Sequence, residues 1–196
     1  TDNFGDSYNI TCAGGFGGYT FNNRKLNIYS RLGFGYERNI LNGKNNNDIY
    51  PYFRIEASYK INKNSSLFGY VNLENSTPSI SWRASDVIRS NELTYITGNP
   101  DLDIWHNYCT HLAYNWYYRN IWKLAVFGGY NWDEGRVAAV YEPYDDGKAL
   151  IRRFINNGNY GSGYLGAAVN CNLLNNALQL YANMSQNYYR TTGIYD

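Results

Sequence analysis

The residues best suited to chemistry lie in one short stretch, TGNPDLDIWHNYCTHLAYNWYY, which begins at position 97. It contains both histidines of the chain, His106 and His111, together with Cys109, Asp101 and Asp103. Imidazole, thiolate and carboxylate groups are the usual ligands of zinc, and three or four of them must converge on one point. The stretch is therefore a candidate metal or catalytic site, provided that the backbone brings these side chains together.

The spacing of these residues argues against convergence. From Trp105 to Arg119, aromatic or apolar residues alternate with small or polar ones, which predicts a β-strand. Because side chains alternate across a strand, His106 faces away from Cys109 and His111, which share a face. We predict no metal site and no catalytic site here. The alternative is a two-ligand site of Cys109 and His111 that another strand completes.

No other segment of the sequence has the pattern of an active site. Cys12, Cys109 and Cys171 are scattered without CxxC spacing, so they form neither a zinc module nor a disulfide framework. The GGFGG run at 14–18 leads into another strand rather than a helix, unlike a phosphate-binding loop. The YDDGK sequence at 144–148 is typical of a turn. We therefore expect neither an enzyme nor a bound cofactor.

Composition favours an all-β fold. Charged residues make up 17% of the 196 residues and nearly cancel, which leaves a net charge of +1. A nucleic-acid-binding protein would carry a basic excess, so nucleic acid is not an expected partner. The 22 tyrosines favour strands, and the abundant asparagine and glycine favour turns.

The length of the alternating stretches distinguishes two kinds of β protein. Strands of soluble proteins run about five or six residues, whereas a tilted membrane-spanning strand needs about 9 to 11. Many stretches here are longer than that, and tyrosine and tryptophan gather near their ends, as in the aromatic girdles of outer-membrane barrels. We predict an antiparallel up-and-down transmembrane β-barrel in the bacterial outer membrane, surrounded by lipid. The predicted strands, about ten, are 8–21, 25–39, 49–62, 67–75, 105–119, 122–134, 136–143, 148–156, 158–173 and 176–190.

The connections and the alternation orient this barrel. Outer-membrane barrels have short periplasmic turns and longer external loops, so we assign 40–48 and 75–104 to the outside. The shorter connections predicted at the periplasmic end are 22–24, 62–66, 120–121, 143–147 and 174–176. Charges are costly on a lipid-facing surface, so the polar side of the strands is predicted to line the lumen. That side carries Arg31, Glu37, Arg54, Glu56, Lys60, His111 and Lys123.

One segment carries a family resemblance. In LFGYVNLENSTPSISWRASDVIRSNELTYITGNPDLDIWHNYCTHLAYNW, Pro78–Ser79–Ile80 precedes the GNPDL sequence at 98–102, and a long aromatic strand follows. This order resembles the β-barrel of Bacteroidetes-type outer-membrane proteins of the TonB-dependent receptor class. The later NNGNYGSGYLGAAVNCNLLNNALQLYANMS is similar to paired strands near the end of such barrels.

The resemblance implies a receptor that imports a nutrient ligand, such as a glycan, siderophore or peptide, with energy from the TonB complex. It also implies a 22-strand barrel that holds an N-terminal plug. We therefore expect residues 1–196 to be a single, incomplete barrel segment of a larger receptor whose plug lies outside this chain. Because rigid walls position binding loops, ligand contacts are predicted within 75–104, with Trp82, Arg83 and Tyr95 as candidates.

Two other functions fit the pattern of residues. The first is a passive porin or structural outer-membrane barrel without energy coupling. The second is a soluble β-sandwich that binds carbohydrate, in which the aromatic residues would form a platform for sugar rings. Two stacked sheets around a filled core would favour the sandwich over the membrane barrel.

Overall fold

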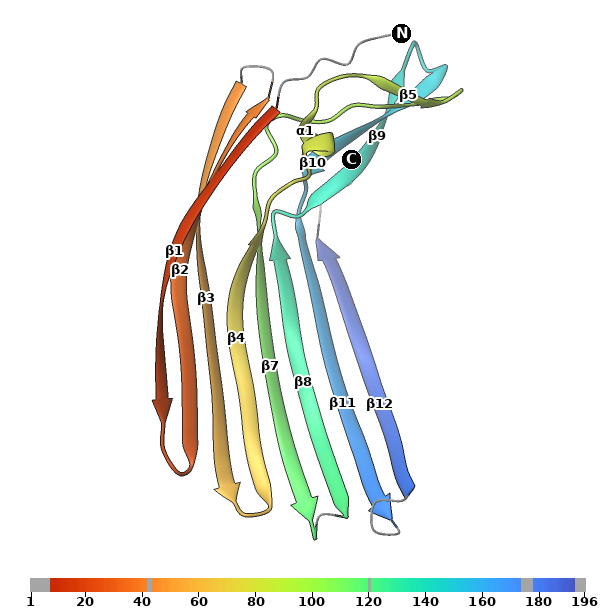
Figure 1. The fold of residues 1–196 in the computed structure, drawn as a ribbon. Coiled ribbons are helices and arrows are strands. Elements are labelled where there is room, and N and C mark those ends of the chain that lie inside the picture. Colours follow the sequence, from red (N-terminus) through yellow and green to blue (C-terminus); the bar gives the residue numbers. More distant parts are fainter. Residues whose placement is uncertain (1–7, 42–43, 120, 174–177, 193–196) are drawn as a thin grey trace.

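The chain folds almost entirely as β-structure, in two separate sheets (Figure 1). The computed structural model describes residues 8–41, 44–119, 121–173 and 178–192. The larger sheet, here called the wall, is an antiparallel meander of eight strands in the order β1-β2-β3-β4-β7-β8-β11-β12. Its strands are β1 (Tyr8–Asn22), β2 (Leu26–Leu41), β3 (Lys44–Asn62), β4 (Ser65–Ser76), β7 (Trp105–Tyr118), β8 (Trp122–Glu134), β11 (Asn159–Leu173) and β12 (Leu178–Thr192).

The smaller sheet lies at one end of the wall and projects from it (Figure 1). In this sheet β10 pairs in parallel with β6 and antiparallel with β9. Together with the one-turn helix α1 (Ile80–Arg83) it forms what we call the cap. Its strands are β5 (Ile88–Asn91), β6 (Thr94–Ile96), β9 (Val137–Tyr144) and β10 (Ala149–Asn156). We call this the long-loop end of the wall and the opposite end the short-turn end.

Asparagine side chains close the turns at the short-turn end. The Oδ1 of Asn23 accepts hydrogen bonds from two following backbone N–H groups, both at 2.8 Å. The Oδ1 of Asn62 accepts one from the backbone N–H two residues later, also at 2.8 Å. Asparagine is favoured in turns because its side chain satisfies backbone donors locally. Turns lie at both predicted connections, 22–24 and 62–66, although the observed strands leave only 23–25 and 63–64 between them. Position 120 and the predicted connection 174–176 lie outside the described residues.

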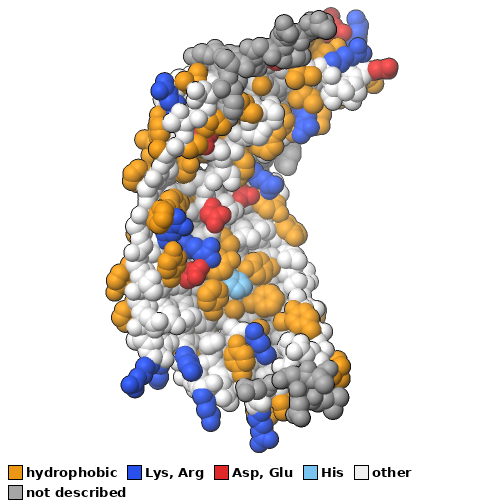
Figure 2. Space-filling view, in the orientation of Figure 1, with side chains coloured by type: hydrophobic (Ala, Val, Ile, Leu, Met, Phe, Trp, Pro, Cys, Tyr) orange, Lys and Arg blue, Asp and Glu red, His pale blue; other side chains and the backbone are white. Residues whose placement is uncertain are grey.

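The register gives the wall two different faces. Residues paired directly across antiparallel strands share a face, and pairing places Glu56, Tyr70, His111 and Tyr164 in one row. The residues that follow or precede them along each strand point to the opposite side. The polar face, shown in Figure 2, carries Arg31, Glu37, Arg54, Glu56, Lys60, Glu74, His111 and Lys123. The residues predicted to line a lumen therefore do share a face.

The opposite, apolar face presents large hydrophobic side chains without covering them. Its exposed residues include Leu32, Phe34, Ile55, Val71, Leu112, Val126, Leu165 and Met184. The two most deeply buried apolar residues, Leu102 and Ile151, lie instead at the cap and are each 2% exposed. So large an apolar surface is unfavourable in water, whereas the outside of a membrane barrel requires one. The two sheets do not stack face to face, so the fold is not a β-sandwich.

Three details of the predicted barrel are wrong. The segment 40–48, predicted as an external loop, belongs to β2 and β3 wherever it is described. The strands predicted at 136–143 and 148–156 exist as β9 and β10, but they pair in the cap rather than in the wall. Their turn at 143–147, predicted at the same end as 22–24 and 62–66, consequently lies at the opposite, long-loop end. Short strands cannot reveal from their alternation alone which sheet they join.

Candidate functional site

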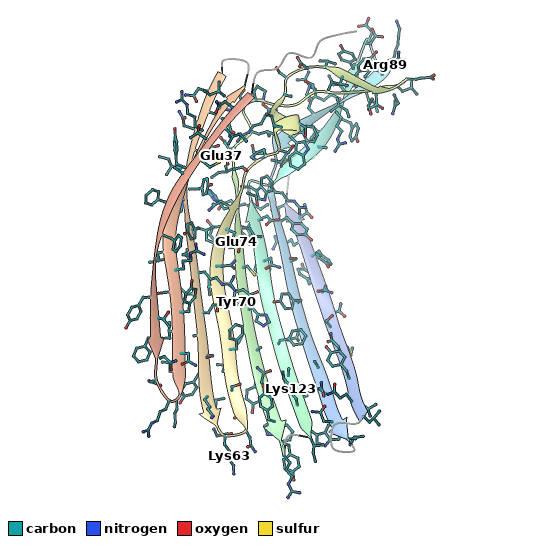
Figure 3. All side chains as sticks on the ribbon, in the orientation of Figure 1. Glu37, Lys63, Tyr70, Glu74, Arg89 and Lys123 are labelled. Carbon is teal, nitrogen blue, oxygen red and sulfur yellow. The ribbon has the colours of Figure 1, made fainter. Side chains whose placement is uncertain are left out.

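The polar face of the wall is lined by charged and amide side chains that pair with one another. Arg54 forms an ion pair with Glu56 beside it on β3. The Nδ2 of Asn107 donates to Asp133 Oδ1 at 2.5 Å, across the β7–β8 pair. Figure 3 shows side chains of this face along the wall, including the labelled Glu37, Tyr70, Glu74 and Lys123. Such a surface suits contact with water or with other polar groups.

The two histidines occupy opposite faces of β7, as the spacing predicts. His111 lies on the polar face, where its Nδ1 is 2.6 Å from Tyr164 Oη and its ring stacks on that of Tyr70 at 5.3 Å. His106 lies on the other face and hydrogen-bonds the Asn75 side chain. Cys109 shares the face of His111 and contacts the hydroxyl group of Tyr70. This cluster is an aromatic patch rather than a set of metal ligands.

The candidate metal ligands of the opening stretch do not converge as one set. In the part of the chain that the structure describes, no group of three His, Cys, Asp or Glu residues is placed to hold a metal ion. Asp103 lies before the strand, and its backbone N–H donates to Asn156 Oδ1 at 2.9 Å. The backbone N–H of Asp101 donates to Asn99 Oδ1, also at 2.9 Å.

Arg83 is the charged residue among the three predicted ligand contacts. It ends α1 and is only 4% exposed. Its Nη2 donates to the backbone oxygen of Leu102 at 2.9 Å and pairs with Asp48 at 3.3 Å. Its Nε and Nη1 are buried and have no hydrogen-bond partner among the described residues. A buried guanidinium normally satisfies its donors, so Arg83 keeps hydrogen-bonding capacity at two nitrogens that the described residues do not use.

The GNPDL sequence holds α1 in place. The backbone N–H groups of Gly98 and Asn99 donate to the carbonyl oxygens of Ala84 and Trp82, at 2.7 and 2.6 Å. A Cβ at position 98 would lie 2.3 Å from the Ala84 oxygen and 2.6 Å from the Trp82 oxygen, so only glycine fits. The GNPDL sequence therefore acts as a clamp on the helix that carries Arg83. Neither residue spacing nor residue type indicated this contact.

A cavity of about 220 Å³ opens between α1 and the polar face of the first wall strands. Glu37 and Asn39 lie on its wall side, are 7% and 6% exposed, and hydrogen-bond one another at 2.7 Å. The residues lining it are Ile10, Cys12, Glu37, Asn39, Asn46, Thr77, Pro78, Ser79, Ile80 and Arg83. The sequence indicated Glu37 as lumen-facing, but it did not indicate that the chain before α1 folds over it.

The predicted ligand residues Trp82 and Tyr95 lie in different aromatic clusters. The Trp82 ring stacks on Phe154 at 5.4 Å and on Trp105 at 6.4 Å, so it joins α1 to β10 and to the wall. Tyr95 lies on β6, with its ring 4.8 Å from that of Tyr144 on β9. Both side chains are half-buried. Of the three candidates, only Arg83 lines the cavity.

A curved antiparallel wall with an apolar outside, a polar inside and elaborated connections at one end defines the fold of an outer-membrane β-barrel. Solved structures of similar fold support this assignment. The chain is similar to the FrpB iron transporter from Neisseria meningitidis (F5-1 variant), with a TM-score of 0.68 at 10% identity over 96% of this chain. It is equally similar to the siderophore receptor PirA from Pseudomonas aeruginosa, with 0.68 at 9% identity over 95%. For the copper transporter OprC the values are 0.60, 8% and 83%.

These neighbours are built on outer-membrane β-barrels. The chain covers 27% of the FrpB chain, 44% of the PirA chain and 28% of the OprC chain, less than half of each. No family model matches the sequence, and no curated protein does. Among the described residues, no helix is long and apolar enough to span a membrane.

Proposed function

We propose that this chain is part of the wall of a TonB-dependent-receptor-like transport barrel in the bacterial outer membrane. The observation that carries the proposal is the wall itself, with its lipid-type face outside and its paired polar groups inside. The likeness to iron, siderophore and copper transporters supports a transport function over an enzymatic one. The proposed cargo is a nutrient ligand, such as a glycan, siderophore or peptide.

The open edges of the wall support the proposal that 1–196 is one segment of a larger barrel. β1 and β12 each pair with only one strand among the described residues. An unpaired edge exposes backbone donors and acceptors, which cannot be left unsatisfied in a membrane. Further strands, up to the 22 of a full receptor, would close the wall around a plug that contacts the TonB complex.

Ligand contact is proposed at the cavity beneath α1, which Arg83 lines. Trp82 and Tyr95 remain proposed contacts from the cap, which lies at the external end of the wall. This arrangement would place a charged anchor at the top of the lumen and aromatic rings outside it.

Uptake by whole cells tests the proposed function. Cells carrying the intact protein are given labelled ferric siderophores, oligosaccharides or short peptides, with and without a protonophore. We expect uptake of one class that stops when the proton gradient collapses, because TonB-coupled import consumes that gradient. Uptake that continues unchanged in the protonophore would favour the passive porin instead.

A further inference from the structure

The short-turn end of the wall has a charge distribution unlike the rest of the molecule. The described residues nearest this end, 18–30, 57–70, 111–119, 121–128, 164–173 and 178–187, contain six lysines and arginines and no aspartate or glutamate. The six are Arg24, Lys25, Lys60, Lys63, Arg119 and Lys123. Figure 2 shows the basic side chains projecting at this end, and Figure 3 labels Lys63 and Lys123 there. A chain with a net charge of only +1 therefore concentrates positive charge at one rim.

Four of these cations surround a single cavity of about 330 Å³. Arg24 and Lys25 come from the β1–β2 turn, whereas Lys60 and Lys63 come from the end of β3 and the turn that follows. The two turns are joined by a hydrogen bond from the backbone N–H of Lys60 to the carbonyl of Lys25, at 2.7 Å. The backbone thus holds the four charges around one space rather than leaving them on independent loops.

Neutral donors complete the lining of this cavity. Asn27, Ser58, Asn62, Ser66 and Tyr117 also face it, and Asn27 Nδ2 donates to Ser58 Oγ at 3.3 Å. Hydroxyl and amide groups beside clustered cations are the usual surroundings of a bound oxyanion.

No described carboxylate neutralises the four cations. None of them forms an ion pair with a described residue. The nearest acidic residue along β3 is Glu56, and it already pairs with Arg54. Like charges held close together repel one another, and a polyvalent anion would relieve that repulsion.

We propose that this cavity is a binding site for a phosphate-type oxyanion at the short-turn rim of the barrel. Single exposed charge pairs contribute little, so the site depends on several cations acting together on a ligand with more than one negative charge. A phosphate group can come from a free anion that enters from the adjacent aqueous space. It can also come from the headgroup of an anionic phospholipid in the leaflet that surrounds this end.

Pyrophosphate titration tests the site directly. Isothermal titration calorimetry is run on the intact protein in zwitterionic detergent at low salt, for the wild type and for Lys60→Gln/Lys63→Gln. The control is Lys148→Gln/Arg89→Gln, which removes the same charge from the cap, at the opposite end. We expect about a tenfold loss of affinity in the rim variant, little change in the control, and weaker wild-type binding as salt is raised.

A second arm identifies the source of the phosphate group. The three proteins are reconstituted in phosphatidylcholine nanodiscs with and without phosphatidylglycerol. After purification, the enrichment of phosphatidylglycerol in the protein-containing discs is measured. Pyrophosphate binding that is lost in the rim variant supports a free anion. Phosphatidylglycerol enrichment that is lost only in that variant supports a lipid headgroup. The proposal is overturned if wild type, rim variant and control behave alike in both arms, and this outcome would leave the transport proposal untouched.

Discussion

Arg83 has a structural role, yet part of its hydrogen-bonding capacity is unused. Its Nη2 is fixed by Asp48 and by the Leu102 carbonyl, while two other nitrogens remain without partners. Breaking one side of a buried ion pair costs more than the pair contributes, because the remaining charge stays desolvated. The same residue therefore links the stability of α1 to the proposed ligand cavity.

Replacing Arg83 by methionine should destabilise the protein by about 1.5–3 kcal/mol, the range for hydrogen bonds to charged groups. Asp48→Asn in the same protein should recover part of this loss, because it removes the carboxylate left without a partner. Denaturant unfolding of the wild type, both single variants and the double variant measures the coupling. Additive effects of the two substitutions would show that the ion pair does not operate.

Gly98 provides a second test at the residue scale. Alanine there would place a Cβ against two backbone oxygens that hold the clamp, so α1 must shift. Overpacking of this kind costs about 1–3 kcal/mol, and hydrogen exchange should accelerate across residues 80–104. Gly15→Ala is the matched control, because a Cβ at Gly15 meets nothing within 4 Å. Equal protection in the two variants would contradict the clamp.

At the scale of the elements, the wall strands could be predicted wherever one local rule, the alternation of apolar and polar residues, continues along the strand. Alternation of apolar and polar residues placed β7 and β8 within one residue of their observed ends. The cap could not be predicted in the same way. Strands β5 and β6 have only four and three residues; they pair with each other, and β6 also pairs with β10 from a distant part of the chain.

The candidate site was only partly predictable for the same reason. Glu37 was predictable as a polar-face residue because its position on β2 fixes its direction. Asp48 was assigned to a loop because the asparagines at 45–47 are typical of turns. In the structure these residues belong to β3, which begins at Lys44. The meeting of Asp48 with Arg83 depends on the path of the chain between β4 and β7, which no periodic pattern encodes.

An arginine substitution should change the stability of the protein by different amounts on the two faces of β7. Leu112→Arg places a charge on the apolar face and should destabilise the barrel by about 2–4 kcal/mol if the site lies near the bilayer midplane. Asn115→Arg, on the polar face of the same strand, should change stability little. Unfolding of both variants in lipid vesicles measures the difference. Similar losses for both would argue against a lipid-facing and a lumen-facing side.

At the scale of the whole molecule, polarity is arranged along two directions. Across the wall, the apolar face is separated from the polar face by single-residue alternation. Along the wall, the elaborated cap and the Arg83 cavity lie at one end, whereas the basic rim lies at the other. A membrane-spanning orientation accounts for both, because it gives each face and each end a different environment.

Whether the wall spans a membrane is tested most directly by the solvent accessibility of consecutive positions along β7 in a lipid bilayer. Spin labels are attached to single cysteines at 107 to 118 in a protein whose native cysteines are replaced, and collision rates with oxygen and with a water-soluble nickel chelate are compared. A membrane-spanning wall predicts a period of two, with even positions favouring oxygen in the lipid and odd positions favouring nickel in an aqueous lumen. Equal accessibility of both faces to the nickel chelate would contradict a membrane-spanning wall.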